Sequence, residues 1–219
     1  MSIEEKSIDF NFSARYFDNG LEIEKTKAIW FVFHGYGQLA FYFIRKFESL
    51  KNAGIRVIAP EGLSKFYLDE KTQRVGANWM TKDDRIRDIK NYQTYFKNVY
   101  QEVLSKYKEK NWPITLLGFS QGGATVGRCA ALDGIQYNRL ILWAGLFPFD
   151  MDSETGRATF KDKIIEFVYG TEDPYLNDSR FAEMEKLSKM FGVSPRVTTF
   201  KGGHIIDNKT LQKFISPTL

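Results

Sequence analysis

The feature that most constrains the fold is an alternation of short apolar runs with longer amphipathic stretches along most of the 219 residues. Several of the runs are apolar throughout, as expected of strands that are covered on both faces. Such an alternation is typical of an α/β fold, with a mostly parallel central sheet and helices on both faces. We expect strands at 28–34, 55–59, 114–119, 139–143, 164–169 and 196–200, and helices at 38–52, 83–108, 121–132, 179–191 and 207–215.

Other segments are less regular. Residues 8–16 alternate between apolar and polar well enough to form an edge strand or one arm of a hairpin. Residues 61–82 have no strong periodicity, and we expect a surface loop there, beside the functional site. Residues 144–163 are too few for a separate lid domain. Because no repeat, low-complexity tract or linker is found, we expect residues 1–219 to form one domain.

Composition argues against several classes of protein. The net charge is only +4 and the basic residues are scattered, so we expect no nucleic-acid partner. Cys129 is the only cysteine, which rules out an internal disulfide and fits a reducing compartment. The first residues are polar, unlike a signal peptide, and no apolar run has the length of a membrane span. We therefore expect a cytoplasmic protein without stable membrane insertion, either a monomer or a homodimer.

A candidate nucleophile lies in GFSQG at 118–122, which matches the pattern G-x-S-x-G. The motif follows the apolar run 114–117 and opens a helix-compatible run at 124–131, so it has the strand, sharp turn and helix that a nucleophile elbow requires. The turn places Ser120 at the N-terminus of the helix, where free N–H groups and the helix dipole favour a developing oxyanion. The alternative is an ordinary glycine-rich turn in which Ser120 caps the helix.

The candidate general base follows from the scarcity of histidine. A serine hydroxyl needs a base near neutral pH, and the chain has only two histidines, His34 and His204. His204 follows two glycines in a loop after the last expected strand, at the same carboxyl edge of the sheet as Ser120. His34 follows an earlier strand and belongs to another loop. We expect His204 to be the base and His34 to hold its own loop in place.

The candidate acid has to orient the imidazole ring and stabilise its protonated form. Asp173 follows the strand expected at 164–169, in GTEDP at 170–174, and we prefer it to the adjacent Glu172. With Asp173 the three residues occur in the order Ser, Asp, His, which is the order found in α/β-hydrolases. Asp150, after the preceding strand, is the second candidate.

A candidate oxyanion hole lies where the sequence FHGYG, at 33–37, follows the apolar strand around Val32. A His-Gly loop at this position can direct a backbone N–H toward the centre of the site. The second donor would be the N–H of Gln121, the residue after the nucleophile. The alternative is a simple glycine-containing turn between a strand and a helix.

Several of these segments resemble one known family. FHGYG, AP, NWM, GFSQGG, YGTEDP and GGH occur in the order found in phospholipase/carboxylesterase-type serine hydrolases, which include acyl-protein thioesterases and small bacterial carboxylesterases. The resemblance spans nearly the whole chain, and GFSQGG is its most specific segment. It implies an α/β-hydrolase fold without a lid domain, a catalytic triad of Ser120, Asp173 and His204, and backbone N–H donors from Tyr36 and Gln121.

The resemblance also implies that Trp79 lies beside the site. The sequence departs from the family's usual pattern at three positions: Gln38 stands where an Asp is usual, Met80 where an aromatic residue is common, and Tyr169 precedes Gly170 where His-Gly is frequent. These departures concern the choice of substrate more than the chemistry.

These observations predict a serine esterase or thioesterase that acts on small or medium acyl groups through an acyl-enzyme. We expect no cofactor and no metal, since no cluster of ligating residues stands out in the sequence. We expect aromatic side chains to line the substrate pocket, namely Trp79, Phe41 and Phe147. Two alternatives remain open: a non-catalytic member of the fold that binds a small molecule, and a peptidase or acyltransferase that uses the same triad.

Overall fold

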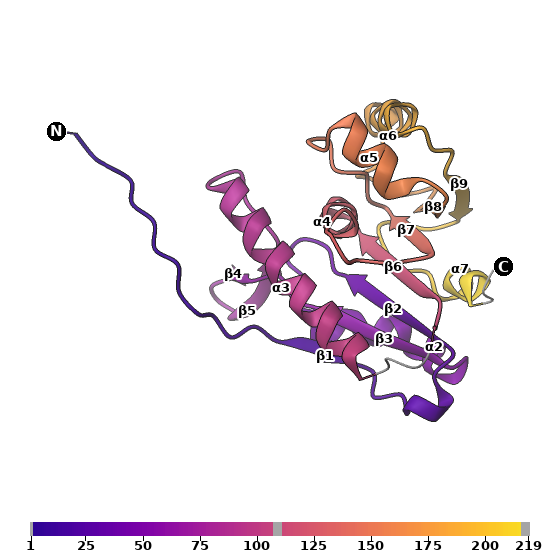
Figure 1. Cartoon of the computed structure of the whole chain (residues 1–219). Coiled ribbons are helices and arrows are strands. Elements are labelled where there is room, and N and C mark those ends of the chain that lie inside the picture. Colours follow the sequence, from indigo (N-terminus) through magenta and orange to yellow (C-terminus); the bar gives the residue numbers. More distant parts are fainter. Residues whose placement is uncertain (1, 107–110, 216–219) are drawn as a thin grey trace.

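A seven-stranded sheet forms the centre of the computed structural model, which describes residues 2–106 and 111–215 (Figure 1). The strands lie in the order β1-β3-β2-β6-β7-β8-β9, and all neighbours are parallel except β1 and β3. Parallel register brings the carboxyl ends of the strands to one edge, where α/β sheets bind their ligands. The strands are β1 (Tyr16–Asp18), β2 (Ala28–Phe33), β3 (Ile55–Pro60), β6 (Ile114–Phe119), β7 (Arg139–Trp143), β8 (Ile164–Gly170) and β9 (Arg196–Phe200).

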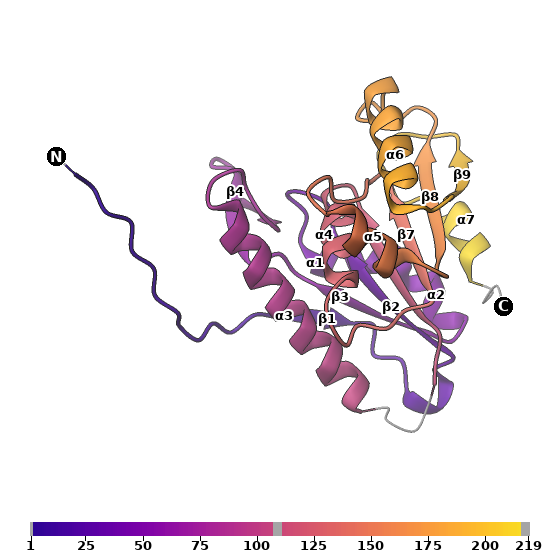
Figure 2. The same cartoon turned by 45° about the horizontal axis from the view of Figure 1, so that its top comes forward.

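Helices cover both faces of this sheet (Figure 2). One apolar core lies under α3 (Arg85–Ser105), α4 (Gln121–Ala130), α5 (Ser153–Phe160) and α6 (Asp178–Phe191). The other lies under α1 (Ala40–Ile44), α2 (Glu48–Asn52) and α7 (Asn208–Leu211), together with the short 3₁₀ turns η2 (Arg45–Phe47) and η3 (Gln212–Phe214). A further 3₁₀ turn, η1 (Ile23–Lys25), precedes β2. None of the described helices is both long and apolar enough to cross a membrane.

The six strands expected from the apolar runs are confirmed to within one residue at each end, but the helices differ more. The helix expected at 38–52 is divided into α1, η2 and α2, and this turn brings the rings of Phe43 and Phe47 into a T-shaped contact at 5.2 Å. Helix α5 was not expected, because only Gly156 and Phe160 form its buried face. The last residues of the helix expected at 83–108 lie outside the described residues.

The strand expected at 8–16 is wrong in its extent. Only Tyr16–Asp18 pairs, and Tyr16 lies opposite Pro60, the last residue of β3. Pro60 has no N–H to extend the ladder, so the alternating residues before Tyr16 have no neighbouring strand. The segment from residue 2 to 15 runs away from the sheet without regular structure (Figures 1 and 2).

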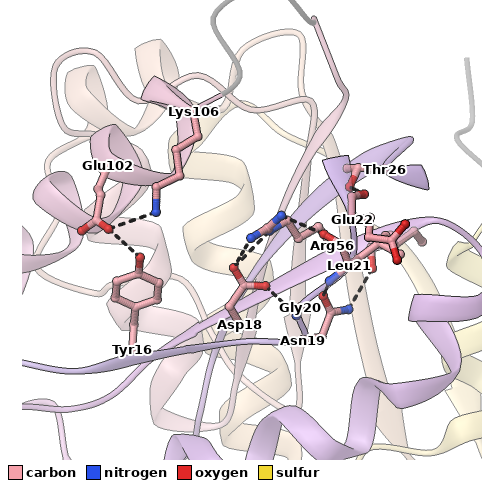
Figure 3. Close-up of polar contacts among 11 residues, drawn as sticks. Tyr16, Asp18, Asn19, Gly20, Leu21, Glu22, Thr26, Arg56, Glu102 and Lys106 are labelled. Atoms are coloured by element: carbon pink, nitrogen blue, oxygen red, sulfur yellow. Dashed lines mark hydrogen bonds and ion pairs between the residues drawn. The ribbon is translucent and has the colours of Figure 1, made fainter. Parts of the chain in front are cut away.

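Polar contacts hold β1 at the edge of the sheet (Figure 3). The guanidinium group of Arg56 donates two hydrogen bonds to Oδ2 of Asp18, at 2.6 and 3.0 Å, and a third to the carbonyl of Leu21. At the other end of the strand, the Tyr16 hydroxyl donates to Glu102 on α3 at 2.9 Å. These contacts stabilise a strand that is too short to be held by its ladder alone.

The surface loop expected at 61–82 contains a β-hairpin instead. Its strands are β4 (Ser64–Asp69) and β5 (Arg74–Asn78). β5 also pairs with the loop after β2, where Gly37 donates its N–H to the carbonyl of Ala77 at 2.9 Å. Most residues of β4 are exposed, so the hairpin has no alternating burial from which the sequence could have revealed it.

Gly156→Ala should destabilise the protein, although alanine favours helices over glycine by about 1 kcal/mol. A Cβ at Gly156 would collide with the ring of Phe191, which is already packed between Phe147 and Phe160. We expect a loss of about 1–3 kcal/mol in the free energy of unfolding, measured by urea denaturation. Thr94→Ala, at an exposed position of α3, is the control and should be neutral or stabilising; equal stability of Gly156→Ala and wild type would contradict the prediction.

Candidate active site

Ser120 lies at the turn from β6 to α4 in a backbone conformation that side chains rarely adopt, with φ 54° and ψ −119°. The turn is tight enough that a Cβ at Gly118 would collide with the carbonyl of Gly122. Two main-chain hydrogen bonds fix it: Ser120 N–H donates to the carbonyl of Trp143 at 2.9 Å, and Gly123 N–H to the carbonyl of Ser120 at 2.9 Å. Among the described residues the Ser120 hydroxyl has no hydrogen-bond partner, so it is free to meet a ligand.

His204 and Asp173 form a hydrogen-bonded pair. Nδ1 of His204 lies 2.7 Å from Oδ2 of Asp173, and because a carboxylate only accepts, Nδ1 carries the proton. The other carboxylate oxygen accepts the N–H of Tyr175 at 2.9 Å. The Asp173 side chain is fully buried, whereas that of His204 is 19% exposed. Nε2 of His204 is the ring nitrogen that this contact with Asp173 leaves open.

The two loops that carry this pair are packed closely together. A Cβ at Gly170 would collide with the carbonyl of Gly202, and Glu172 N–H donates to that same carbonyl at 2.9 Å. The indole N–H of Trp143, at the end of β7, donates to the carbonyl of Ile205 at 2.8 Å and holds the His204 loop over the sheet. Asp173 and His204 are thus positioned by backbone contacts.

The His204 ring lies beside the nucleophile elbow. It contacts the ring of Phe119, the residue before Ser120, with centroids 4.7 Å apart. Ser120 and His204 are not hydrogen-bonded in this structure. Catalytic hydrogen bonds are often long without substrate and tighten when it binds. The structure thus brings the three predicted residues to one edge of the sheet, with the acid–base contact already formed.

The loop after β2 passes directly over Ser120. A Cβ at Gly35 would lie 3.2 Å from Cβ of Ser120 and 3.0 Å from the ring of Phe119, so a side chain here would crowd the serine. The side chain of Gln38 accepts the Gly35 N–H at 2.9 Å and holds the loop from the inside. Among the described residues, no acceptor is found for the backbone N–H of Tyr36 or of Gln121, the two predicted oxyanion donors.

Gln121 has a second feature that the sequence did not reveal. Its side-chain amide donates to Oδ1 of Asn78 at 2.7 Å and to the carbonyl of Met80 at 3.1 Å, and its oxygen accepts the N–H of Trp79 at 3.4 Å. These contacts join the first turn of α4 to the end of hairpin β4–β5. The motif GFSQG had singled out Gln121 for its backbone alone, and Gln38 had been noted only as a departure from the family pattern.

His34 is buried and structural. Its Nδ1 contacts the carbonyl of Gly35 at 2.8 Å, Nε2 accepts the N–H of Gly62 at 2.9 Å, and the ring stacks on Trp79 at 4.8 Å. Burial lowers the pKa of His34 to about 4, so the ring is neutral near pH 7. Both ring nitrogens are occupied, as expected for a histidine that holds its loop in place.

Asp150, the second candidate for the acid, is engaged elsewhere. Arg128 donates to it at 2.6 Å and Arg85 lies 2.9 Å from its other oxygen. Burial alone would raise the pKa of the carboxyl group, but the hydrogen bonds and charges of the two arginines outweigh it and hold the pKa below its ordinary value. Asp150 is thus part of an ion-pair cluster, and the histidine contact belongs to Asp173.

Of the three aromatic residues expected to line a substrate pocket, two are buried in the core and one, Phe41, lies at the surface. Trp79 and Phe147 are each 1% exposed: Trp79 packs between Phe33 and His34, and Phe147 against Phe160. The expectation that they line the pocket is corrected, because buried rings have no surface for a substrate. Phe41 is partly exposed but packs on other aromatic rings, and a role for it stays a prediction.

Comparison with known protein families agrees with this geometry. The model of the Phospholipase/Carboxylesterase family matches residues 22–217. The chain belongs to the phospholipase/carboxylesterase family. A search of curated proteins found no match to the sequence.

Several solved structures have the same α/β-hydrolase fold as this chain, although their sequences are less than 20% identical to it. Esterase PE8 is 16% identical with a TM-score of 0.66, over 93% of this chain and 95% of that one. Acyl-protein thioesterase 2 from Zea mays is 15% identical with a TM-score of 0.67, over 93% and 96%. SOBER1 from Arabidopsis thaliana is 18% identical with a TM-score of 0.61, over 86% and 95%. The central sheet with helices on both faces is therefore that of an α/β-hydrolase.

Ser120→Gly should make the protein more stable than Ser120→Ala. Glycine tolerates the backbone angles of residue 120, whereas alanine keeps the Cβ and the strain. We expect a difference of about 1 kcal/mol in the free energy of unfolding, measured by chemical denaturation of the two variants. Equal stability, or a less stable glycine variant, would show that the elbow is not strained.

Stability should fall as the pH is lowered from about 6.5 toward 4, in part because of His34. The unfolded chain takes up a proton on this ring near its ordinary pKa of 6.5, but the folded protein does so only near 4. The unfolded state therefore binds more protons in this window, and His34 removes about 2 kcal/mol of stability between pH 7 and pH 5. In His34→Asn, urea denaturation at both pH values should show a correspondingly shallower dependence; parallel profiles would contradict the prediction.

Proposed function

We propose that this member of the family is a serine esterase or thioesterase that hydrolyses esters of small or medium acyl groups through Ser120, His204 and Asp173. The observation that supports it most is the His204–Asp173 hydrogen bond at 2.7 Å beside a strained serine at a helix N-terminus. A buried carboxylate that fixes Nδ1–H of a histidine leaves Nε2 as a base, which is the arrangement an activated serine needs.

The reaction proceeds in two steps through an acyl-enzyme. Oγ of Ser120 attacks the carbonyl carbon while Nε2 of His204 takes the hydroxyl proton, and Asp173 stabilises the resulting imidazolium. When the tetrahedral intermediate collapses, His204 gives this proton to the leaving alcohol or thiol. A water molecule, deprotonated by His204, then attacks the acyl-enzyme. As this second tetrahedral intermediate collapses, His204 returns the proton to Oγ of Ser120 and the carboxylic acid is released.

Two backbone N–H groups stabilise the oxyanion of each tetrahedral intermediate. Tyr36 and Gln121 supply them, and neither N–H has another acceptor among the described residues. Donors fixed in advance contribute roughly 3 kcal/mol each to transition-state stabilisation. The side chains of Gln38 and Gln121 hold the two segments in place: Gln38 accepts the N–H of Gly35 in its own loop, and Gln121 donates to the carbonyl of Met80 after hairpin β4–β5.

An ester or thioester is favoured over the other substrates considered. Family membership supports a carboxylic-ester hydrolase, and a non-catalytic role would leave the strained elbow and the oriented acid–base pair without a purpose. A peptidase or acyltransferase would use the same residues, so product analysis with ester, thioester and amide substrates, and with an added alcohol acceptor, separates these activities.

Treatment with a fluorophosphonate probe tests the nucleophile. We expect a single adduct in the intact mass of the wild type and none in Ser120→Ala, because only an activated serine attacks the probe. Ser179→Ala, at an exposed position of α6, is the matched control and should be labelled like the wild type.

Asp173→Asn should lower kcat for a p-nitrophenyl ester by roughly 10⁴, as loss of the orienting acid does in other triads.

The outcomes separate cleanly. An adduct that persists in Ser120→Ala would move the nucleophile to another residue. No adduct on folded wild-type protein would overturn the proposed hydrolase and favour a binding role for the site.

A further inference from the structure

A groove of about 580 Å³ lies beside the loop that carries the oxyanion donor Tyr36. Three segments form its walls: the loop itself, the segment α1–η2, and hairpin β4–β5. Gly37 and Gln38 of this loop line the groove, and Gly35 of the same loop lies over Ser120. The residues that matter for its chemistry are Gln38, Tyr42, Lys46, Leu68, Arg74 and Val75.

The apolar part of the groove is open to solvent. Tyr42, Leu68 and Val75 are all exposed, although each is a side chain whose burial is favourable by about 25 cal/mol per Å² of apolar surface. Leu68 lies over the oxyanion loop, since a Cβ at Gly37 would be 3.0 Å from its Cδ2. The apolar wall thus reaches the same loop whose Gly35 lies over Ser120.

The charged part of the groove is entirely positive. Lys46 and Arg74 line it, and no acidic residue does. Among the described residues, neither cation lies within ion-pair distance of a carboxylate. The acidic residue opposite Arg74 in the hairpin, Asp69, accepts hydrogen bonds from the N–H groups of Lys71 and Thr72 and forms no ion pair with Arg74 within 4 Å. The charge of Arg74 does act on Asp69, but no acidic residue lines the groove itself. Cations that line a concave site attract anions more strongly than cations on a flat surface.

We propose that this groove selects substrates that carry a negative charge, a carboxylate or a phosphate, at the end of an apolar portion several atoms from the scissile ester. The inference rests on the proposed function and narrows its substrate class to anionic esters or thioesters. The apolar portion contacts Tyr42, Leu68 and Val75, and the charged end binds Lys46 and Arg74. Neither cation touches the reacting atoms, so both determine specificity and leave the chemistry to Ser120 and His204.

The test compares two substrates that differ by one charge: the mono-p-nitrophenyl ester of adipic acid, and the same ester with its free carboxylate methylated. Release of p-nitrophenol gives kcat/KM for each. We expect the wild type to prefer the anionic ester, and the preference to fall as salt is added. Lys46→Gln and Arg74→Gln should each reduce the ratio of the two kcat/KM values by roughly two- to fivefold.

A matched control separates a local effect from the loss of net charge. Lys186→Gln removes one exposed cation from α6, outside the groove, and should leave the ratio unchanged. Butyrate esters of 4-hydroxybenzoate and of its methyl ester repeat the comparison with the charge on the alcohol side. A preference in only one of the two series assigns the groove to the acyl or to the alcohol portion.

Ligand binding to Ser120→Ala tests the groove independently of the proposed hydrolysis, because this variant lacks the proposed nucleophile. Hexanoate, hexyl phosphate and hexanol are titrated calorimetrically into this variant, with and without Lys46→Gln. Anion binding that Lys46→Gln weakens supports the groove even if neither ester is hydrolysed, and the carboxylate and phosphate probes show which anion it prefers. Hydrolysis of both esters with equal kcat/KM, or equal binding of hexanol and the anions, would overturn the inference while leaving a hydrolase intact.

Discussion

The close approach of backbone segments at the turn between β6 and α4 is the constraint on which the rest of the site depends. Ser120 adopts a left-handed backbone conformation, and such strain costs about 1–3 kcal/mol. It persists because β7 supplies an acceptor for the Ser120 N–H, and because glycine at 118 and 122 leaves room for the chain to reverse. Replacing either glycine would force a Cβ into a main-chain carbonyl, so the turn itself restricts the sequence on both sides of the serine.

Trp143 connects this turn to the rest of the site. Its carbonyl accepts the Ser120 N–H, and its indole N–H donates to Ile205 in the loop that carries His204. The next strand, β8, delivers Asp173, and Gly170 lets that loop pack directly on the His204 loop. Because all these strands are parallel, their carboxyl ends meet at one edge, and short loops suffice to bring three distant parts of the sequence together.

The sequence predicted the strands well because a strand buried on both faces is apolar along its whole length, as β2 and β6 are. It missed α5 and the hairpin β4–β5, because neither has an apolar periodicity of its own: α5 presents a glycine and one phenylalanine to the core, and β4 is mostly exposed. The candidate site residues could be proposed from motif and chain order. The roles of the Gln38 and Gln121 side chains could not, since a glutamine's partners depend on loops that come together only in the folded protein.

The two histidines show why residue type alone does not define a base. Both follow strands and both lie next to glycine, yet their environments are opposite. Both ring nitrogens of His34 are engaged, so it has no free lone pair to offer. Burial also lowers its pKa to about 4, so the ring resists protonation. His204 has one nitrogen fixed by a buried carboxylate and leaves the other free at an accessible edge. In the proposed reaction, the carboxylate of Asp173 would offset the charge of a proton taken from Ser120, whereas the buried site of His34 opposes such a charge.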